Sequence, residues 1–407
     1  MTCIIQVLPA LQQGGVERGT IEMARAMQQA GIPNLVISAG GRMVHELEQL
    51  GVEHITLPVD SKNPIKIFAN IKKLAQIFQE KGATLVHVRS RAPAWSVKFA
   101  CRQTRIPFIA SFHGIYGTQP FLLKKPYNHV MLEGQHVIAV SNHVKNHIMK
   151  EYGTPSEKIT VVHRGADVAY FDPDKVSDER VAAMRTNWQV PNDMPVITLV
   201  GRLTAWKGQS VLLDACAKMQ HKNFVCLLVG SDQGRVEYHQ NLVKQAQALY
   251  GKPQVLFIDT CQDMPTLYRM STVIVNASTE PEAFGRTITE AQAMKRIVVA
   301  TAHGGACETI QDGQTGFLVP PGDAVALAGT LDKVLDMSPE ELAQIETQAR
   351  QSVVENFSVQ KMCENTLALY RRFEAKPLET FVAEFAATKT DGGEATPTES
   401  ANISENH

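Results

Sequence analysis

The stretch Cys3-Ile4-Ile5-Gln6-Val7-Leu8 is an apolar run, and the loop Gly14-Gly15-Val16-Glu17-Arg18-Gly19 follows it before a helical pattern over Thr20–Gln29. A short apolar run, a glycine-rich turn and a helix form the repeating unit of an open parallel sheet. Backbone N–H groups at Gly14 and Gly15 can approach a phosphate oxygen there, although a tight turn without a ligand is the simpler alternative. The turn lacks the full G-x-G-x-x-G pattern and an acidic ribose ligand, which disfavours a dehydrogenase.

The same pattern recurs in two series along the chain. The first series continues with Leu35–Ser38, His54–Leu57, Leu85–Arg89, Phe108–Ser111, His136–Ser141 and Ile159–His163. The second comprises Val196–Val200, Phe224–Val229, Val255–Ile258, Thr272–Asn276, Ile297–Ala300 and Gly316–Val319. Two mostly parallel sheets are predicted, and ligands of such sheets bind beyond the carboxyl ends of the strands. Ala169–Pro195 is typical of a connection with a short helix, which puts a boundary near Asp167.

The composition is that of a globular chain with two cores. Its 407 residues exceed the size at which one core usually keeps growing, and 44% are hydrophobic and 20% charged. No apolar run approaches the roughly 18 residues that span a bilayer, and no signal-peptide pattern is present. Seven scattered cysteines disfavour a disulfide framework, so we expect a reducing cytoplasm. A net charge of −1 predicts no nucleic-acid partner.

A second candidate loop follows the first strand of the second series. Val200–Gly208 contains Arg202 and Lys207 beside two glycines, at the functional edge of the predicted sheet. An arginine fork and a lysine point charge can converge there on a diphosphate and stabilise a leaving group. The alternative is a pair of solvated surface cations.

The segment Glu280–Ala291 is the most informative part of the chain. Prolines and a glycine keep its first half in a loop that contains Glu282, and a helical pattern over Arg286–Lys295 puts Glu290 in the first turns of a helix. Carboxylates can accept hydrogen bonds from sugar or ribose hydroxyls, and backbone N–H groups around Phe284–Thr287 can bind phosphate. Either glutamate alone would more simply be a surface charge, and their joint spacing favours a site.

These motifs together resemble a known family. Glu282 and Glu290, with seven residues between them and His303-Gly304-Gly305 later, are similar to the E-x7-E signature of retaining family-4 glycosyltransferases, glycosyl transferases group 1. Gly201-Arg202-Leu203-x3-Lys207-Gly208 resembles that family's phosphate-binding loop, and the Gly14–Arg18 loop resembles its N-terminal glycine loop. The three motifs occur in the family's order over most of the chain.

The resemblance implies a role for each motif residue. Glu290 would bind the donor ribose, Glu282 the hydroxyls of the transferred sugar, and Gly15 a phosphate through its backbone. His113 matches the family's histidine near the reaction centre, although a strand-end histidine is more often structural. The implied catalytic residues are His113, Glu282, Arg202 and Lys207. The implied donor-binding residues are Gly14, Gly15, Arg202, Lys207, Glu282, Phe284, Gly285, Arg286, Thr287 and Glu290.

The resemblance also implies a GT-B fold, in which two Rossmann-like α/β domains with mostly parallel sheets face a central cleft. Residues 1–167 would form the N-terminal acceptor-side domain, completed by about 358–385, and residues 168–357 the nucleotide-sugar-binding domain. The helix expected over Ser358–Phe373 would cross back to the N-terminal domain, and 386–407 would be a disordered tail. Arg164 stands where many members have asparagine, and it could line the cleft or stabilise the hinge.

The fixed cations predict chemistry without a metal or a cofactor. A UDP- or GDP-linked sugar would be the donor, and cations and helix termini would stabilise its diphosphate. Asp172-Pro173-Asp174 is the only close carboxylate pair resembling a metal motif, and its place in the connection favours a structural role. Front-face attack, with the departing phosphate oxygen taking the acceptor's proton, would retain the anomeric configuration without a covalent intermediate.

Two segments of the first half combine cations with apolar residues. They are Lys62–Phe78, with Lys66, Lys72 and Lys73, and Phe121–Val130, with Lys124 and Lys125. A basic amphipathic face can rest on an anionic membrane, which would suit a lipid-linked acceptor. The alternative is that the apolar stripe packs on the sheet, as in any helix of this fold.

The leading hypothesis is a retaining hexosyltransferase that transfers sugar to a carbohydrate or lipid-linked acceptor hydroxyl. Its expected role is lipopolysaccharide or other envelope polysaccharide biosynthesis. The expected location is the cytoplasm, with peripheral contact to the inner face of the cytoplasmic membrane left open. The alternatives are a nucleotide-sugar 2-epimerase-like enzyme and a catalytically degenerate nucleotide-sugar-binding protein.

Overall fold

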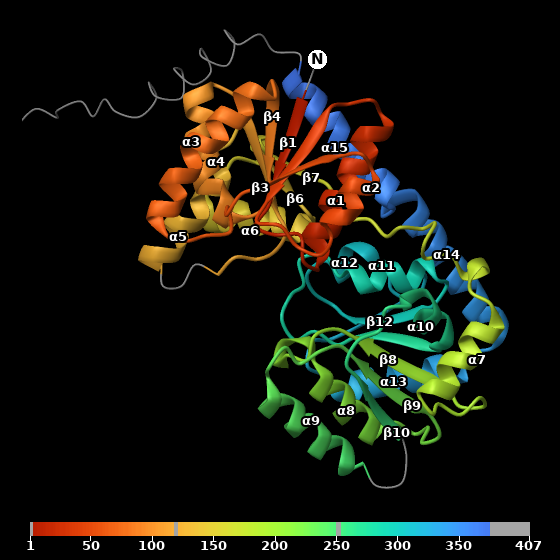
Figure 1. The fold of residues 1–407 in the computed structure, drawn as a ribbon. Helices are drawn as coiled ribbons and strands as arrows, with labels where there is room; N and C mark the ends of the chain where they lie inside the picture. Colours follow the sequence, from red (N-terminus) through yellow and green to blue (C-terminus); the bar gives the residue numbers. More distant parts are fainter. Residues whose placement is uncertain (1–2, 118–120, 250–253, 375–407) are drawn as a thin grey trace, which may run out of the picture.

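Two parallel sheets, one in each half of the molecule, form the framework of the computed structural model (Figure 1), which describes residues 3–117, 121–249 and 254–374. The first sheet has the order β3-β2-β1-β4-β5-β6-β7, and the second β10-β9-β8-β11-β12-β13. The first contains β1 (Cys3–Val7), β2 (Asn34–Ser38), β3 (Glu53–Thr56), β4 (Ala83–Val88), β5 (Phe108–Phe112), β6 (His136–Ala139) and β7 (Ile159–Val161). The second contains β8 (Val196–Val200), β9 (Val225–Val229), β10 (Gln254–Ile258), β11 (Val273–Asn276), β12 (Ile297–Thr301) and β13 (Phe317–Val319). Every predicted apolar run is a strand, and the two-sheet α/β fold is confirmed.

Helices follow most strands. In the first half they are α1 (Gly15–Gln29), α2 (Val44–Gln49), α3 (Pro64–Glu80), α4 (Arg91–Thr104), α5 (Phe121–His129) and α6 (Asn142–Tyr152). After the connection helix α7 (Asp178–Asn187) come α8 (Gln209–Lys218), α9 (Val236–Gln247), α10 (Met264–Met270), α11 (Arg286–Ala293), α12 (Ala306–Thr309), α13 (Ala324–Asp336), α14 (Pro339–Asn356) and α15 (Val359–Glu374). Helix α1 begins at Gly15 and not at Thr20, so most of the predicted glycine loop is its first turn. None of the described helices is both long and apolar enough to cross a membrane.

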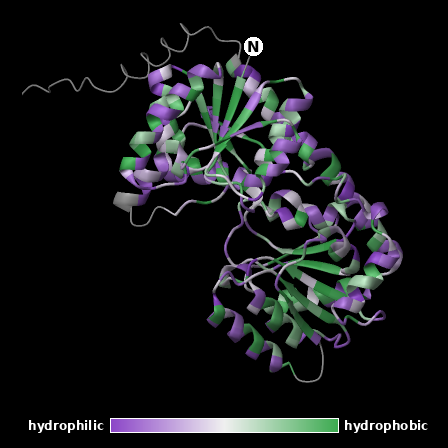
Figure 2. Cartoon of the chain, viewed as in Figure 1, coloured by the Kyte–Doolittle hydropathy of each residue, from purple (hydrophilic) through white to green (hydrophobic). Residues whose placement is uncertain are grey.

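Each sheet is apolar on both faces because helices cover both. Figure 2 shows the apolar strands at the centre of each half and mixed polar and apolar helices around them. In the first half, alternate residues of β1 separate two cores: Ile5 packs with α3 and α4, and Ile4 packs with α1 and α15. In the second half, Leu199 packs with α8 and α13, and Val196 packs with α10. Burial on both faces is why these strands are nearly continuous apolar runs.

Helix α15 crosses back to the first sheet, as the sequence predicts. Its buried residues Met362, Cys363, Leu369 and Tyr370 pack with residues of α1, β1, β4 and β5. The Tyr370 hydroxyl lies 2.6 Å from Nδ1 of His87, which is buried in β4. The predicted tail 386–407 lies outside the described residues, and the domain limits stay a prediction.

The chain passes between the two halves twice, after β7 and again between α14 and α15. The two crossing segments hydrogen-bond to each other. The N–H of Ala166 donates to the carbonyl of Phe357 at 2.8 Å, and the N–H of Val359 donates to the carbonyl of Ala166 at 2.9 Å. A Cβ atom on Gly165 would lie 2.4 Å from the Val359 nitrogen, so a glycine is needed for this close approach. The hinge between the halves therefore consists of two chain segments joined by backbone hydrogen bonds.

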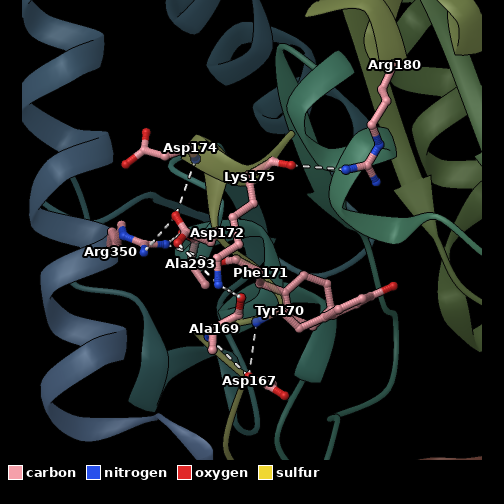
Figure 3. Close-up of polar contacts among 10 residues, drawn as sticks. All are labelled: Asp167, Ala169, Tyr170, Phe171, Asp172, Asp174, Lys175, Arg180, Ala293 and Arg350. Atoms are coloured by element: carbon pink, nitrogen blue, oxygen red, sulfur yellow. Dashed lines mark hydrogen bonds and ion pairs between the residues drawn. The ribbon is translucent and has the colours of Figure 1, made fainter. Parts of the chain in front are cut away.

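The connection after β7 is held by α14. Figure 3 shows the guanidinium of Arg350 reaching this connection, where it donates to the Phe171 carbonyl at 3.0 Å and lies 3.4 Å from the Asp172 carboxylate. The N–H of Asp174 donates to the same carboxylate at 3.3 Å. The contacts of Asp172 and Asp174 are those of a structural turn. Among the described residues, no group of three or more His, Cys, Asp or Glu side chains is placed to hold a metal ion.

Both sheets change winding direction where the site motifs lie. In the first sheet β1 lies between β2 and β4, and in the second β8 lies between β9 and β11. Ligands of such sheets bind at these switch points, beyond the carboxyl ends of the strands. Gly208 brings the loop after β8 to the end of β11, because a Cβ there would lie 1.8 Å from the Ala277 carbonyl oxygen.

Gly208→Ala is expected to destabilise the protein by two separate effects. Its φ of +73° belongs to the left-handed region, which costs a side chain about 1–2 kcal/mol. The clash with Ala277 adds about 1–3 kcal/mol of overpacking. Gly322→Ala is the matched control, because Gly322 has a φ of +75° and no atom within 4 Å of the added Cβ. Equal losses in urea unfolding for the two variants would contradict the packing argument.

Candidate active site

A cleft of about 970 Å³ lies at the carboxyl ends of both sheets and is lined from both halves of the chain. The predicted site residues that line it are Gly15, His113, Arg202, Lys207, Glu282, Phe284, Gly285, Arg286 and Thr287. Gly14 and Glu290 are not among its lining residues. Residues from sequence positions far apart are therefore brought into one cleft, as the parallel-sheet topology requires.

Lys207 and Glu282 form an ion pair across the switch point of the second sheet. Nζ of Lys207 lies 2.8 Å from Oε1 of Glu282, and each side chain is 14% exposed. The same Oε1 accepts from Asn276 Nδ2 at 2.8 Å and from the Ser278 hydroxyl at 2.6 Å. All three of these bonds fall on one carboxylate oxygen, and the other oxygen, Oε2, can accept from a ligand hydroxyl.

Glu282 is held in its ionised form. Burial by itself raises the pKa of the Glu282 carboxyl, but the Lys207 ammonium and the Ser278 and Asn276 hydrogen bonds outweigh it and lower the pKa below the usual value. An ionised carboxylate accepts hydrogen bonds and has no proton to give. Such a carboxylate can accept from ligand hydroxyls, and the predicted contact to the transferred sugar stays a prediction.

Glu290 lies behind the cleft, in the first turns of α11. Its Oε2 accepts from the buried Tyr268 hydroxyl at 2.9 Å, and its Oε1 lies 3.2 Å from Arg286 Nη2. Burial raises the pKa of Glu290, while Arg286 and Tyr268 oppose the rise. Glu290 thus acts on the cleft through Arg286, which lines it. A contact to ribose stays a prediction.

The start of α11 presents uncapped N–H groups at the cleft. Gly285 precedes the helix with a φ of +86°, and no side chain caps the first N–H groups. Unpaired N–H groups and the positive end of a helix attract phosphate. Gly285, Arg286 and Thr287 all line the cleft there. The exposed Arg202 adds a cation from the loop after β8, and no acidic side chain in the described part of the chain pairs with it.

His113 lines the cleft from the end of β5. Burial, Arg164 and Arg89 hold the pKa of its ring well below the usual value, so the ring is neutral. Its Nδ1 lies 3.1 Å from Arg164 Nη1, whereas its Nε2 is buried and has no partner among the described residues. A neutral histidine with a free ring nitrogen can exchange a hydrogen bond with a ligand.

Arg164 lines the cleft, which is one of the two possibilities that the sequence left open. Its residue is 7% exposed, lies in the hinge and lines the cleft. Nη2 donates to the Gly15 carbonyl, and a Cβ on Gly15 would lie 3.6 Å from Arg164 Nη2 and 3.5 Å from Arg286 Cδ. Burial first, then the neighbouring Arg286, lowers the pKa of Arg164 to about 9.

The sequence did not single out several residues that complete the site. Asn276 and Ser278 fix Glu282, and Tyr268 fixes Glu290. Glu308 links the two halves of the chain, because it accepts from the N–H groups of Asn142 and His143 at 2.8 Å. A local signal existed for Asn276 and Ser278, since polar residues that follow a buried strand lie at a functional edge.

The fold and site define a two-domain α/β protein with an electropositive cleft and one pinned, ionised carboxylate. Residues 13–170 match glycosyltransferase family 4, and residues 181–352 match glycosyl transferases group 1. The chain belongs to this glycosyltransferase family, which confirms the resemblance drawn from its motifs.

One solved relative supports that membership, a second solved structure shares the fold, and a curated relative matches over part of its length. A glycosyltransferase from Rickettsia africae has a TM-score of 0.86 and 40% identity, and the match covers 92% of this chain and 99% of that one. Anabaena HepE in complex with UDP-glucose has a TM-score of 0.79 and 24% identity over 91% and 100% of the two chains. The D-inositol 3-phosphate glycosyltransferase of Mycobacterium tuberculosis is 28% identical over 258 residues, 63% of this chain and about half, 52%, of that protein.

Lys207→Met is expected to destabilise the protein by about 3–5 kcal/mol at pH 8, because the buried Glu282 carboxylate loses its counter-charge. In the wild type the lowered pKa of Glu282 stabilises the fold above the usual glutamate value, and this contribution is lost as the pH falls. In the variant, burial raises the pKa, so the penalty shrinks as the pH falls toward 5. Urea unfolding of wild type and variant between pH 5 and 8 measures how this destabilisation changes with pH.

Lys207→Met/Glu282→Gln is the control, because it removes both charges and is expected to recover most of the loss. A penalty for Lys207→Met that does not change with pH would contradict the ion-pair argument.

Proposed function

We propose that this glycosyltransferase transfers a hexose from a UDP- or GDP-linked sugar to an acceptor hydroxyl, with retention of the anomeric configuration. The observation that supports it most is the arrangement of one ionised carboxylate between fixed cations. Glu282 supplies a free oxygen for sugar hydroxyls, and Arg202 and Arg286 line the same cleft. A hydroxyl-rich group joined to a diphosphate fits such a surface.

The diphosphate would bind between Arg202, Lys207 and the start of α11. Each of these contributes positive charge or unpaired N–H groups to the same cleft. Charge that develops on the departing phosphate would be stabilised by groups already in place, which lowers the barrier without reorganisation. Gly15 would bring the first turn of α1 close to the same phosphates.

In the proposed step, the bond between the anomeric carbon and the diphosphate oxygen breaks. The acceptor oxygen forms a new bond to that carbon from the same face, and its proton passes to the departing phosphate oxygen. No side chain forms a bond to the sugar. The proposal needs no metal, because the cations that stabilise the leaving group belong to the chain.

The acceptor would enter along the wall of the first half, where Gly114, Ile115, His143 and His147 line the cleft. Burial lowers the pKa of His143, although the nearby Glu308 opposes the shift. The histidine is therefore neutral at the wall of the cleft. We propose a carbohydrate or lipid-linked acceptor of envelope polysaccharide synthesis, such as lipopolysaccharide, and a cytoplasmic location. A 2-epimerase and a degenerate binding protein are the competing proposals, and turnover separates them.

A panel of nucleotide sugars, with and without simple glycoside acceptors, tests the proposal. We expect binding and slow hydrolysis of at least one UDP- or GDP-sugar. The first-formed anomer of the released or transferred sugar, followed by NMR, is expected to have the anomeric configuration of the donor. Glu290→Ala frees Arg286 and is expected to weaken donor binding roughly 10- to 100-fold, as for a charged hydrogen bond. Failure of the wild type to bind or hydrolyse any donor would overturn the proposal, and inversion would overturn retention.

A membrane contact through α3 is part of the proposed function. The structure divides the predicted apolar stripe: Leu74 and Phe78 are fully buried against the sheet, whereas Ile65 and Phe68 are 79% and 77% exposed. Lys72 and Lys73 are exposed on the same helix, whose only acidic residue is at its last position, Glu80. The first turns of α3 follow β3 and lie at the sheet edge that bears the cleft.

Two exposed large apolar side chains among lysines match an anionic membrane, since the apolar groups enter the headgroup region and each lysine adds about 1 kcal/mol near the surface. A lipid-linked acceptor would then be held beside the cleft. This exposed surface is the part of the apolar stripe of α3 that does not pack on the sheet.

The variant Phe68→Ser/Lys72→Glu/Lys73→Glu is expected to lose roughly 100-fold in affinity for vesicles that contain anionic lipid, measured by co-sedimentation. Wild type is expected to bind anionic vesicles and not purely zwitterionic ones. Lys218→Glu/Lys244→Glu is the matched control, because both lysines are exposed on the second half. Vesicle binding that is unchanged by the α3 variant would remove this surface from the proposal.

A further inference from the structure

The hinge places a buried arginine against the histidine of the cleft. Arg164 stands between His163 and Gly165, and Gly165 packs against the backbone of Val359 where the two crossings pair. The position of the Arg164 backbone is therefore set by the hinge. Its side chain extends into the first half, where Nη2 donates to the Gly15 carbonyl and Nη1 lies 3.1 Å from His113 Nδ1.

Helix α1 leaves room for this guanidinium. A Cβ on Gly19 would lie 2.8 Å from Arg164 Nη2 and 3.1 Å from its Cζ, and a Cβ on Gly15 would lie 3.6 Å from Nη2. Both helical positions that the guanidinium approaches are therefore glycine. The glycines of α1 therefore leave space for a large side chain at residue 164.

The hydrogen bond between these residues determines the tautomer of His113. A guanidinium has only donors, so His113 Nδ1 must accept, and the single proton of the neutral ring is on Nε2. That Nε2–H is buried, and no atom of the described residues accepts from it. An unpaired buried donor costs about 1–3 kcal/mol, which an acceptor atom of a ligand in the cleft would recover.

We propose that Arg164 is a positioning residue that holds His113 as the Nε2–H tautomer and presents this proton to a hydroxyl oxygen of the donor sugar. The inference rests on the proposed function, because the ligand is the transferred sugar. It assigns a role to a residue at which this chain departs from the asparagine of many family members. An asparagine is shorter, and its amide can donate or accept, so it would not select one tautomer.

The charges around His113 support this role. Arg164 and Arg89 lie near the ring, and His87 beside them is itself neutral because burial lowers its pKa well below the usual value. Burial raises the pKa of Tyr116, which hydrogen-bonds to the backbone of His113, so this neighbour is uncharged as well. Protonation of His113 would place a third positive charge in this group and would break the bond from Arg164. Loss of Arg164 removes one of the two cations, so the pKa of His113 is expected to rise toward its usual value.

The first test reads the tautomer directly in the full-length protein without any turnover. Nitrogen NMR of 15N-histidine-labelled wild type, assigned with His113→Gln, is expected to show an unprotonated Nδ1 and a protonated Nε2. Arg164→Ala is expected to show a mixture of tautomers and protonation at a higher pH. An Nδ1–H tautomer in the wild type, or an unchanged spectrum in the variant, would overturn the proposal.

The second test is kinetic and uses the donor that the panel identifies. Arg164→Ala and Arg164→Asn are expected to lower kcat/KM for the donor roughly 10- to 100-fold, because the donor sugar loses the hydrogen bond that His113 presents. The acid limb of the kcat profile is expected to move to higher pH. Arg164→Ala/His113→Ala is expected to be no slower than His113→Ala, because one residue acts through the other.

Arg18→Ala is the control for the loss of an arginine near the start of α1, because the Arg18 guanidinium pairs with Glu46 and neither residue is among those that line the cleft. If the losses in kcat/KM of the two single variants multiply in the double variant, Arg164 acts independently of His113, in phosphate binding or in the hinge, and the proposal is overturned. If the wild type turns over no nucleotide sugar, the proposed function fails while the NMR test still reports on the tautomer.

Discussion

The two halves of the molecule are held at a defined separation by one carboxylate. Glu308 follows β12 in the second half and accepts from the N–H groups of Asn142 and His143 at the start of α6 in the first half. Its Oε2 also lies 2.8 Å from His163 Nε2 in the hinge. Burial alone would raise the pKa of Glu308, but these hydrogen bonds lower it to about 2, so the carboxylate is charged at any ordinary pH. A charged carboxylate on the free N–H groups of a helix start is a strong contact.

The distances across the cleft depend on that contact and on the paired crossings beside it. Gly15, His113 and Arg164 belong to the first half and the hinge, whereas Lys207, Glu282 and Arg286 belong to the second. A Cβ on Gly15 would approach both Arg164 and Arg286, so the two cations come together at the glycine turn. Among the described residues, Lys207 and Arg286 each have a carboxylate partner but Arg202 has none, so the cleft keeps positive charge. A diphosphate would complete that balance.

The sequence predicted the sheets well because parallel strands buried on both faces are continuous apolar runs. The glycine turn was predicted, but its helical start at Gly15 was not, since glycine weakens any local helix signal. Lys207 and Glu282 were both expected in the site. Their pairing could not be predicted, because it joins two loops through the tertiary fold. The exposure of Ile65 and Phe68 was equally hidden, since helical spacing does not tell which end of a stripe the sheet covers.

Two glutamates with opposite pKa shifts invite an acid–base interpretation, and their surroundings argue against it. An acid–base pair needs both carboxyls to reach the reacting atoms. Glu282 lines the cleft but is held ionised by Lys207 and two further donors. Glu290 has the raised pKa, yet both of its oxygens are engaged by Tyr268 and Arg286 behind the cleft surface. The shift of Glu290 therefore reports burial and not readiness to give a proton. One glutamate is placed to accept from ligand hydroxyls and the other orients a cation, so in the proposed reaction the acceptor's proton leaves by another route, to the departing phosphate oxygen.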